Sequence, residues 1–476
     1  MEKQKDDIAV LSANREKAIV KTSVIAWVLV LCMLLSFAAC GNKAAEETEE
    51  VPEKPTVISD YSDGVKVVAA AYPEAVAKDM DAAAYAMGSA EYMKWVEDYF
   101  GKMEEAALHQ DGMTDFYKEL QSKIMAPDKD GNIVCSPLNI YIAAAMLAEV
   151  SDGNTRTQVL DALHAGSMDE LRSRIKALWD VNYLNTPTVK SILANSMWLR
   201  NDMEYNEDTL GKLADIYYAS SFSGKMGSEE MNEALRKWTD EATGGLLKDY
   251  VKDMSLNEMT VLALVSTLYY KAAWTDNFSA DRTYAEVFHG TEGDKEVPMM
   301  HKDGTMSVYD CDNFIALGLG LNDSGTMFFF LPKDGIDPAS LAADAQAMSL
   351  VREPGSVESI YPIVHLTVPK FEVSSKTDLC EVFKVLGMTD AFDRYSADFS
   401  NLTDAIDEIW LDSAEHAAMV KIDEEGVTGA AYTELAFAGS GLPQNEIDFK
   451  VDRPFYFVVS SRDGALLFSG VVRNVD

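Results

Sequence analysis

The chain has 476 residues, with 41 Lys and Arg against 78 Asp and Glu, so its formal net charge is −37. Hydrophobic residues make up 47%, which is a globular composition, and the length suffices to bury a sizeable core. This negative charge argues against a nucleic-acid backbone or an anionic membrane surface as a partner. The five cysteines include no C-x-x-C pair and the six histidines show no metal-ligand spacing, so we expect no disulfide framework, no metal and no cofactor.

The N-terminus carries an export signal. Residues 24–39 are apolar or small and follow several lysines and an arginine. Sixteen such residues rise about 24 Å as a helix, which is short for a bilayer span. The run ends in Phe37-Ala38-Ala39-Cys40 and resembles a bacterial lipoprotein signal, in which cleavage precedes a cysteine that becomes lipid-modified. The alternative is an uncleaved N-terminal membrane anchor, and both interpretations place the body outside the cytoplasm or on the cell surface.

Three parts follow from composition. Residues 1–40 are the export segment, and residues 41–57, with five glutamates and two prolines, are predicted to be an acidic flexible tether. From residue 58 to residue 476 we find no further linker and no internal repeat. We therefore expect a single domain over residues 58–476.

The first half of this domain is mainly helical. Residues 79–124 carry apolar side chains at helical spacing, and a short strand over 132–135 precedes a helix from Pro137 to about Glu149. Pro137 suits the first turn of that helix because its missing N–H would be unpaired there in any case.

The second half is rich in strands. Apolar or alternating stretches occupy residues 260–270, 326–331, 365–373 and 417–422, and a terminal hairpin is predicted over 455–460 and 465–472. Gly318 and Gly320 lie inside an apolar strand, where they indicate close strand packing. Helices followed by strands, without regular alternation, predict an α+β fold with large, mainly antiparallel sheets.

The chain shows little sign of catalysis. It lacks the G-x-S-x-G elbow, the Walker loop, the kinase motifs and the dinucleotide-binding glycines. The acids Asp423, Glu424 and Glu425 are interpreted as a solvated face. A hydrolase built around Ser440 remains an alternative with little support, since no base lies near it in sequence.

Residues 424–442 form a long segment that is rich in glycine and alanine and lacks Lys and Arg. Its residues sort by parity: one set, all uncharged, is Val427, Gly429, Ala431, Thr433, Leu435 and Phe437. The other set is Thr428, Ala430, Tyr432, Glu434, Ala436 and Ala438. Successive strand residues face opposite sides of a sheet. An exposed loop that can become a strand, with the first set turned inward, is one interpretation, and a flexible loop with chance alternation is the other.

Ordered motifs over residues 113–476 resemble the serpin family. They occupy residues 132–140, 153–158, 267–274, 297–300, 368–371, 386–400 and 453–470. The resemblance implies a serpin fold, with a multi-helix N-terminal half packed on large sheets and an exposed reactive loop.

The resemblance also implies a serine protease inhibitor, and not an enzyme. A serpin acts as a suicide substrate: the protease attacks a bait bond, and the cleaved loop inserts into the main sheet with the covalently trapped protease. The hinge then comprises Glu424, Glu425, Gly426, Val427, Thr428, Gly429, Ala430 and Ala431. Family spacing puts the reactive bond at Ser440-Gly441, within a bait that includes Phe437, Ala438, Gly439 and Leu442. The sheet-opening region implied by the resemblance comprises Ser136, Asn139, Trp274 and His416.

The sequence departs from the family at a few positions. Val427 stands where a Thr or Ser is usual, Gly429 replaces an Ala, and Asn139 and Ser266 replace a Ser and an Asn. These departures motivate the alternative of a non-inhibitory serpin that acts as a cell-surface binding protein.

The bait itself favours particular targets. No basic residue occurs between Lys421 and Lys450, so we expect elastase-like or subtilisin-like serine proteases, with cysteine proteases as further candidates, and a monomeric inhibitor.

Overall fold

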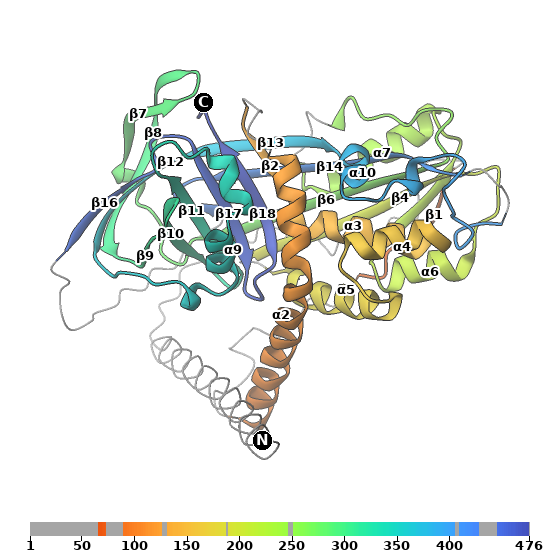
Figure 1. The fold of residues 1–476 in the computed structure, drawn as a ribbon, viewed down its shortest axis with the longest axis horizontal. Helices are drawn as coiled ribbons and strands as arrows, with labels where there is room; N and C mark the ends of the chain where they lie inside the picture. The colour runs from red at the N-terminus through yellow and green to blue at the C-terminus, as the bar shows by residue number, and fades with distance from the viewer. Residues whose placement is uncertain are drawn as a thin grey trace, which may run out of the picture. The chain divides into compact units, whose positions relative to one another are not determined.

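The computed structural model describes residues 65–72, 89–125, 131–186, 189–245, 251–404, 409–427 and 445–475 (Figure 1). All of them belong to one compact unit, Glu53–Asp476. The predicted export segment and tether, and residues 428–444 of the predicted bait loop, lie outside the described residues.

Six of the eight described α-helices end before residue 243. The described α-helices are α2 (Ala90–Ile124), α3 (Pro137–Val150), α4 (Gly153–Ala162), α5 (Met168–Asn182), α6 (Glu207–Asp215), α7 (Glu229–Ala242), α9 (Ala345–Arg352) and α10 (Leu379–Val385). Short 3-10 turns are η2 (Ala280–Arg282), η3 (Pro338–Ala343), η4 (Pro354–Ser356) and η5 (Asp390–Phe392). The helix predicted from Pro137 is confirmed as α3, which Ser136 caps by accepting a hydrogen bond from the Asn139 N–H.

Within the described residues, the main sheet has eight strands. Its strands, in spatial order, are β1 (Lys66–Val68), β5 (Ala219–Gly224), β4 (Val189–Arg200), β6 (Leu262–Ala273), β15 (Gly426–Val427), β14 (Leu411–Ile422) and β13 (Phe371–Asp378), with β3 (Leu184–Asn185) paired to β4. Two pairings in it, β4–β5 and β6–β14, are parallel, and the others are antiparallel.

Two smaller sheets complete the fold. The six-stranded sheet runs β2 (Ile133–Cys135), β18 (Leu466–Val472), β17 (Phe455–Ser461), β11 (Gly325–Pro332), β10 (Phe314–Leu321) and β9 (Val308–Asp310). The four-stranded sheet runs β16 (Glu446–Lys450), β12 (Ile363–Pro369), β8 (Gly293–Thr305) and β7 (Thr283–Gly290). The predicted terminal hairpin is confirmed as β17 and β18, and the α+β class is confirmed with it.

One predicted strand is wrong. Residues 365–373 alternate with period two, yet the structure divides them at Lys370 into β12 and β13, which belong to different sheets. The Lys370 N–H donates to the Pro298 carbonyl, 2.9 Å away, where the chain crosses from one sheet to the other. Period two shows which residues share a face, but it does not show where a chain changes partners.

The main sheet is covered on both faces. Every residue of α3 is buried, and α3 lies against β6 on one face (Figure 1). On the other face, residues of α7 form an apolar cluster with residues of β4, β5 and β6; its members include Met231, Leu235, Trp238, Trp198, Phe222, Ala263 and Val265. A helix that is apolar all round is expected only where protein surrounds it, which is the position of α3.

The close packing predicted at Gly318 can be tested. A Cβ at this position would lie 2.8 Å from the Phe328 ring and 2.9 Å from the Thr326 side chain of the neighbouring strand. We expect Gly318→Ala to lower the free energy of the first unfolding transition by about 1–3 kcal/mol, since added atoms force a packed sheet apart. The matched control is Gly101→Ala in α2, where a Cβ meets nothing within 4 Å. Denaturant unfolding should show the control unchanged or up to about 1 kcal/mol more stable, and equal effects would contradict the prediction.

Candidate functional site

The first residues of the predicted bait loop lie inside the main sheet. Gly426 pairs with Ala273 of β6, and Val427 pairs with Ala272 of β6 on one side and with Ile422 of β14 on the other. Val427 is 1% exposed. A Cβ at Gly426 would lie 2.2 Å from the Ala272 carbonyl oxygen, so only glycine fits this close approach. The predicted exposed loop over residues 424–442 therefore does not include Gly426 and Val427, which lie within the sheet.

Trp274 fixes the turn that leads into β15. Its backbone N–H donates to the Glu425 carbonyl at 3.0 Å, and its indole Nε1–H donates to the Asp423 carbonyl at 2.9 Å. The Phe278 N–H reaches the Glu424 carbonyl at 3.0 Å. Three successive carbonyls between β14 and β15 thus have partners on the segment that follows β6, and the turn is held in one conformation.

The acids of this turn do not form the solvated face that we expected. Glu424 is largely covered, with a side chain 16% exposed, and its Oε2 lies 2.7 Å from Lys370 Nζ. Burial alone raises the pKa of the Glu424 carboxyl, but the hydrogen bond from Lys370 brings the net pKa below its ordinary value. Asp423 Oδ1 accepts the N–H groups of Glu425 and Gly426. Glu425 alone of the three is exposed.

A second polar cluster lies where α3 meets β6 and β14. The Ser136 N–H donates to His416 Nε2 at 2.9 Å. The Asn139 amide donates to the Thr267 carbonyl at 2.5 Å, and the Ser266 hydroxyl donates to the Asn139 carbonyl at 3.3 Å. These bonds tie the start of the buried helix to both strands at the level where His416 and Ser266 stand side by side. The exchange of Asn and Ser at positions 139 and 266 therefore keeps the cluster bonded.

Three polar atoms in or beside this cluster lack a partner among the described residues, and one of them is His416 Nδ1. The other two are Thr267 Oγ1 on β6 and Asn195 Oδ1 on β4, although the Asn195 amide donates to Asn139 Oδ1 at 3.2 Å. A buried polar atom without a hydrogen bond costs about 1–3 kcal/mol. The closed sheet therefore carries unfavourable free energy at this level.

The four residues predicted for the sheet-opening region fall in two places. Ser136, Asn139 and His416 share the cluster under the sheet, but Trp274 lies at the end of β6. Trp274 follows Ser266, which lies beside His416, by eight positions along β6 and just past its end, about 26 Å at 3.3 Å per residue. We name the first group the α3 cluster. We name the group around the turn into β15, which includes Trp274, Lys370 and Glu424, the hinge cluster.

Several predicted positions lie outside the described residues. They are the hinge residues Thr428, Gly429, Ala430 and Ala431, the bait residues Phe437, Ala438, Gly439 and Leu442, the bond Ser440-Gly441 and the lipidation site Cys40. The sequence interpretation missed Asn195 and gave Lys370 no role. An asparagine within the buried strand β4 was a usable signal for Asn195, whereas nothing local to Lys370 points to Glu424.

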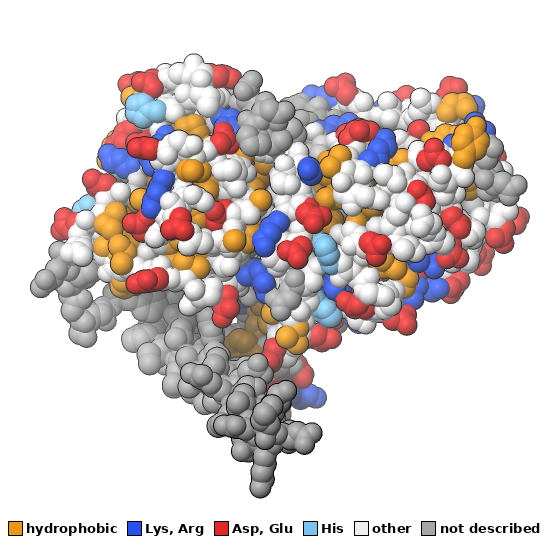
Figure 2. Space-filling model, in the orientation of Figure 1, with side chains coloured by type: hydrophobic (Ala, Val, Ile, Leu, Met, Phe, Trp, Pro, Cys, Tyr) orange, Lys and Arg blue, Asp and Glu red, His pale blue; other side chains and the backbone are white. Residues whose placement is uncertain are grey.

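Other chemistry finds little support in the described part of the chain. There, no group of three His, Cys, Asp or Glu side chains could hold a metal ion, and no helix is long and apolar enough to cross a membrane. The described cysteines, Cys135, Cys311 and Cys380, are buried and form no disulfide with one another. Figure 2 shows acidic side chains spread over the visible face among lysines and arginines.

Burial makes His416 sensitive to acid. It is fully buried, and loss of hydration lowers its pKa from 6.5 to about 4. The unfolded chain binds a proton near pH 6.5 but the folded chain only near pH 4, so acid favours unfolding in this window. From pH 7 to pH 4 we expect His416 to remove about 3 kcal/mol from the free energy of unfolding.

Denaturant titrations between pH 7 and pH 4 measure this loss. The control is His416→Gln, which keeps an acceptor for the Ser136 N–H but does not titrate. The variant should lose about 3 kcal/mol less than the unsubstituted protein over this range. Parallel curves would show that His416 does not cause the loss.

Two named proteins are similar to this chain in sequence. The chain is 28% identical over 411 residues to Serpin-Z2B of Oryza sativa subsp. japonica, covering 78% of this chain and 98% of the relative. It is 26% identical over 376 residues to human antithrombin-III, covering 76% of this chain and 80% of the relative. Both matches extend over most of each protein.

Solved structures show the same fold. A thermophilic serpin, tengpin, in its native state aligns with a TM-score of 0.68 at 23% identity, over 76% of this chain and 93% of that one. Human thyroxine-binding globulin, solved in complex with thyroxine, aligns with a TM-score of 0.66 at 23% identity, over 79% of this chain and 99% of that one. The sequence model of the family described as serpin (serine protease inhibitor) matches residues 111–475. With this match over most of its length, the chain belongs to the serpin family.

Proposed function

We propose that this serpin inhibits serine proteases by trapping them covalently while its cleaved loop inserts between β6 and β14. The observation that carries the proposal is β15. Val427 already pairs with both strands and Gly426 pairs with β6, in the direction that an inserted loop would continue. The site needs no catalytic group of its own, because the protease supplies the chemistry, and we therefore infer an inhibitor and not an enzyme.

Hydrogen bonding favours insertion. Six residue pairs join β6 directly to β14, from Leu411–Leu262 to Ala417–Thr267. A strand that separates them replaces this one ladder with two. Each additional bond contributes about 0.5–1.5 kcal/mol, so several bonds offset the opening of the sheet.

The register of β15 supports the inward set of loop residues. Val427 faces the main core, where it belongs to the same apolar cluster as Leu268 and Ala418. Continuation of the register places Ala431 beside Leu268 and Ala418, on this core face, and Ala430 beside Tyr269 and Met419, on the opposite face. A charge at position 431 would enter the core unpaired, whereas a charge at position 430 would meet half-buried residues.

These neighbours give a matched test. Mixed with an elastase-like or a subtilisin-like protease, the protein should form a complex that survives boiling in SDS. Ala431→Arg should abolish the complex and leave a cleaved substrate, while Ala430→Arg, the same change one residue away, should keep it. Electrophoresis and the molar ratio needed for full inhibition measure both outcomes. If the unsubstituted protein is only cleaved, and gains no heat resistance on cleavage, the non-inhibitory binding protein replaces this proposal.

The bait sequence supports the choice of targets. Residues 437–442 are small or apolar, and the nearest basic residues, Lys421 and Lys450, lie far outside the bait. Proteases with an acidic specificity pocket need a basic residue at the bond, while elastase-like and subtilisin-like pockets accept small or apolar ones. Cysteine proteases with similar pockets are further candidates.

We infer that the inhibitor works outside the cell as a lipid-anchored monomer. The apolar run before Cys40 and the acidic residues 41–57 support this location. In a bacterial host, the protein should incorporate a labelled fatty acid and sediment with membranes, and Cys40→Ala should lose the label. Label retained in Cys40→Ala would exclude this anchor.

A further inference from the structure

The register of β15 fixes where each later loop residue would lie in an opened sheet, an argument that rests on the proposed function. Val427 stands opposite Ala272, and β6 and β14 run parallel with Ser266 beside His416. Because β15 is antiparallel to β6, each step forward along the loop corresponds to one step back along β6. Position 432 therefore falls between Thr267 and Ala417, and position 434 falls between Val265 and Glu415.

Both positions face α7. Val265 belongs to the apolar cluster that α7 forms with the sheet, and Ala417 and Met419 pack against that cluster. Residues directly opposite in adjacent strands point to the same side of a sheet. Tyr432 and Glu434, which the parity of the sequence turned outward, would therefore enter the layer between the sheet and α7 and not open solvent.

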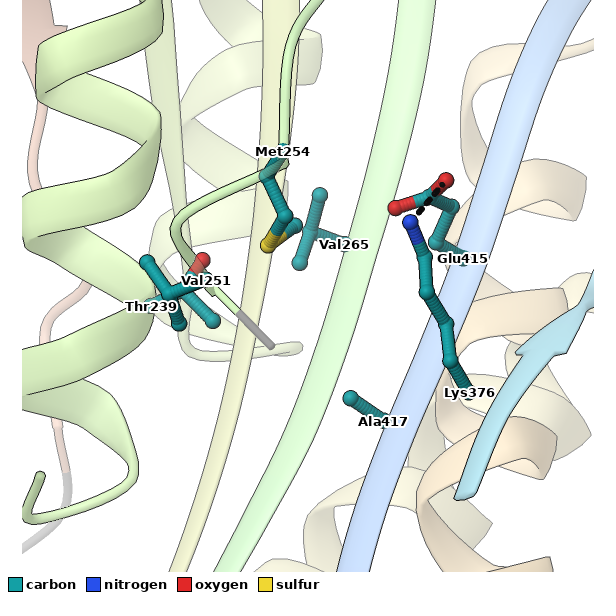
Figure 3. A pocket seen from close by; sticks show the side chains of 7 residues that line it. All are labelled: Thr239, Val251, Met254, Val265, Lys376, Glu415 and Ala417. Carbon is teal, nitrogen blue, oxygen red and sulfur yellow. Dashed lines mark ion pairs between the residues drawn. The ribbon is translucent and has the colours of Figure 1, made fainter. Parts of the chain in front are cut away.

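A hollow lies at this point of the β6–β14 seam, and we name it the seam cavity. It is lined by Thr239, Val251, Met254, Val265, Lys376, Glu415 and Ala417 (Figure 3). Its volume in the closed sheet is about 10 Å³, less than a side chain needs. Entry of a strand moves β14 away from β6 by a further 4.7–4.9 Å or so, and this widens the hollow along its own axis.

The lining has an apolar part and a charged part. Val251, Met254 and Val265 gather on one side, and Lys376 and Glu415 form an ion pair of 2.8 Å on the other (Figure 3). The Thr239 hydroxyl donates to the Leu235 carbonyl, so its lone pairs stay able to accept a hydrogen bond.

We propose that the seam cavity receives the Tyr432 and Glu434 side chains of the inserted loop, with Lys376 as the counter-ion shared by Glu415 and Glu434. The tyrosine ring fills the apolar part, and its hydroxyl lies on the side of Thr239. Glu434 enters directly opposite Glu415, and two carboxylates in this relation repel each other. Lys376 on β13 moves together with Glu415 on β14, because the two strands remain paired, and so it offsets the repulsion when the loop arrives.

Engineered cysteines test the register and the face. The test protein carries Tyr432→Cys and Ala417→Cys, which would lie opposite each other in the opened sheet. Opposite positions on neighbouring strands have Cα atoms about 4.5–5.5 Å apart, within the range of a disulfide. After a trace of protease nicks the loop, mild oxidation should cross-link positions 417 and 432, as detected by mass spectrometry. In the control, Thr433→Cys with Ala417→Cys, the first thiol faces α3 and should not cross-link.

A double-mutant cycle tests the shared counter-ion. Lys376→Met should lower the guanidinium midpoint of the nicked protein, and at least half of that loss should disappear when Glu434→Gln is added. In the intact protein the two changes should be additive. Additive effects in the nicked protein, or no cross-link at 417–432, would overturn the seam cavity as the receiving site, provided that nicking raises heat resistance. If nicking leaves heat resistance unchanged, the proposed insertion itself fails.

Discussion

The parallel pairing of β6 with β14 is the constraint on which the rest of this molecule depends. The two strands are joined directly over six residue pairs, and they diverge where β15 enters between them. Beyond the end of β6, the hinge cluster holds the turn into β15. On the face of the sheet that α3 covers, the α3 cluster ties this buried helix to both strands. The two strands are thus paired directly over one part of their length and separated by β15 at the other end.

The two clusters hold the seam by different physical means. In the hinge cluster, backbone carbonyls and the Lys370–Glu424 ion pair fix a turn near the surface. In the α3 cluster, polar groups are taken fully out of water, and Asn195 Oδ1 is left without a partner among the described residues. Polar groups with hydrogen-bond partners stabilise the closed sheet. A buried polar atom without a partner destabilises it, and so lowers the free energy needed to separate the strands. Both properties agree with the proposed insertion of the loop between β6 and β14.

Described residues before position 111 add a strand and helical turns to the part of the chain that matches the family. The family match begins at residue 111, so β1 and the first turns of α2 precede it. β1 pairs with β5 and covers the edge of the main sheet, and Tyr72, which follows it, stacks on Tyr183 with ring centroids 5.4 Å apart. An edge strand with exposed hydrogen-bonding groups invites pairing with other chains, and β1 supplies that partner from within the chain.

Local sequence determined much of this. Pro137 after Ser136 marked the start of α3, alternation and turn residues marked the terminal hairpin, and the motifs identified the family, because caps, turns and periodicity act between residues close in the chain. Tertiary structure alone decided that residues 365–373 divide between two sheets, that Trp274 lies apart from His416, and that Lys370 covers Glu424. It also decided that α7 covers the face of the main sheet on which Val265 and Ala417 lie. Parity tells which residues share a face of a strand, but what lies against that face depends on segments far away in the sequence.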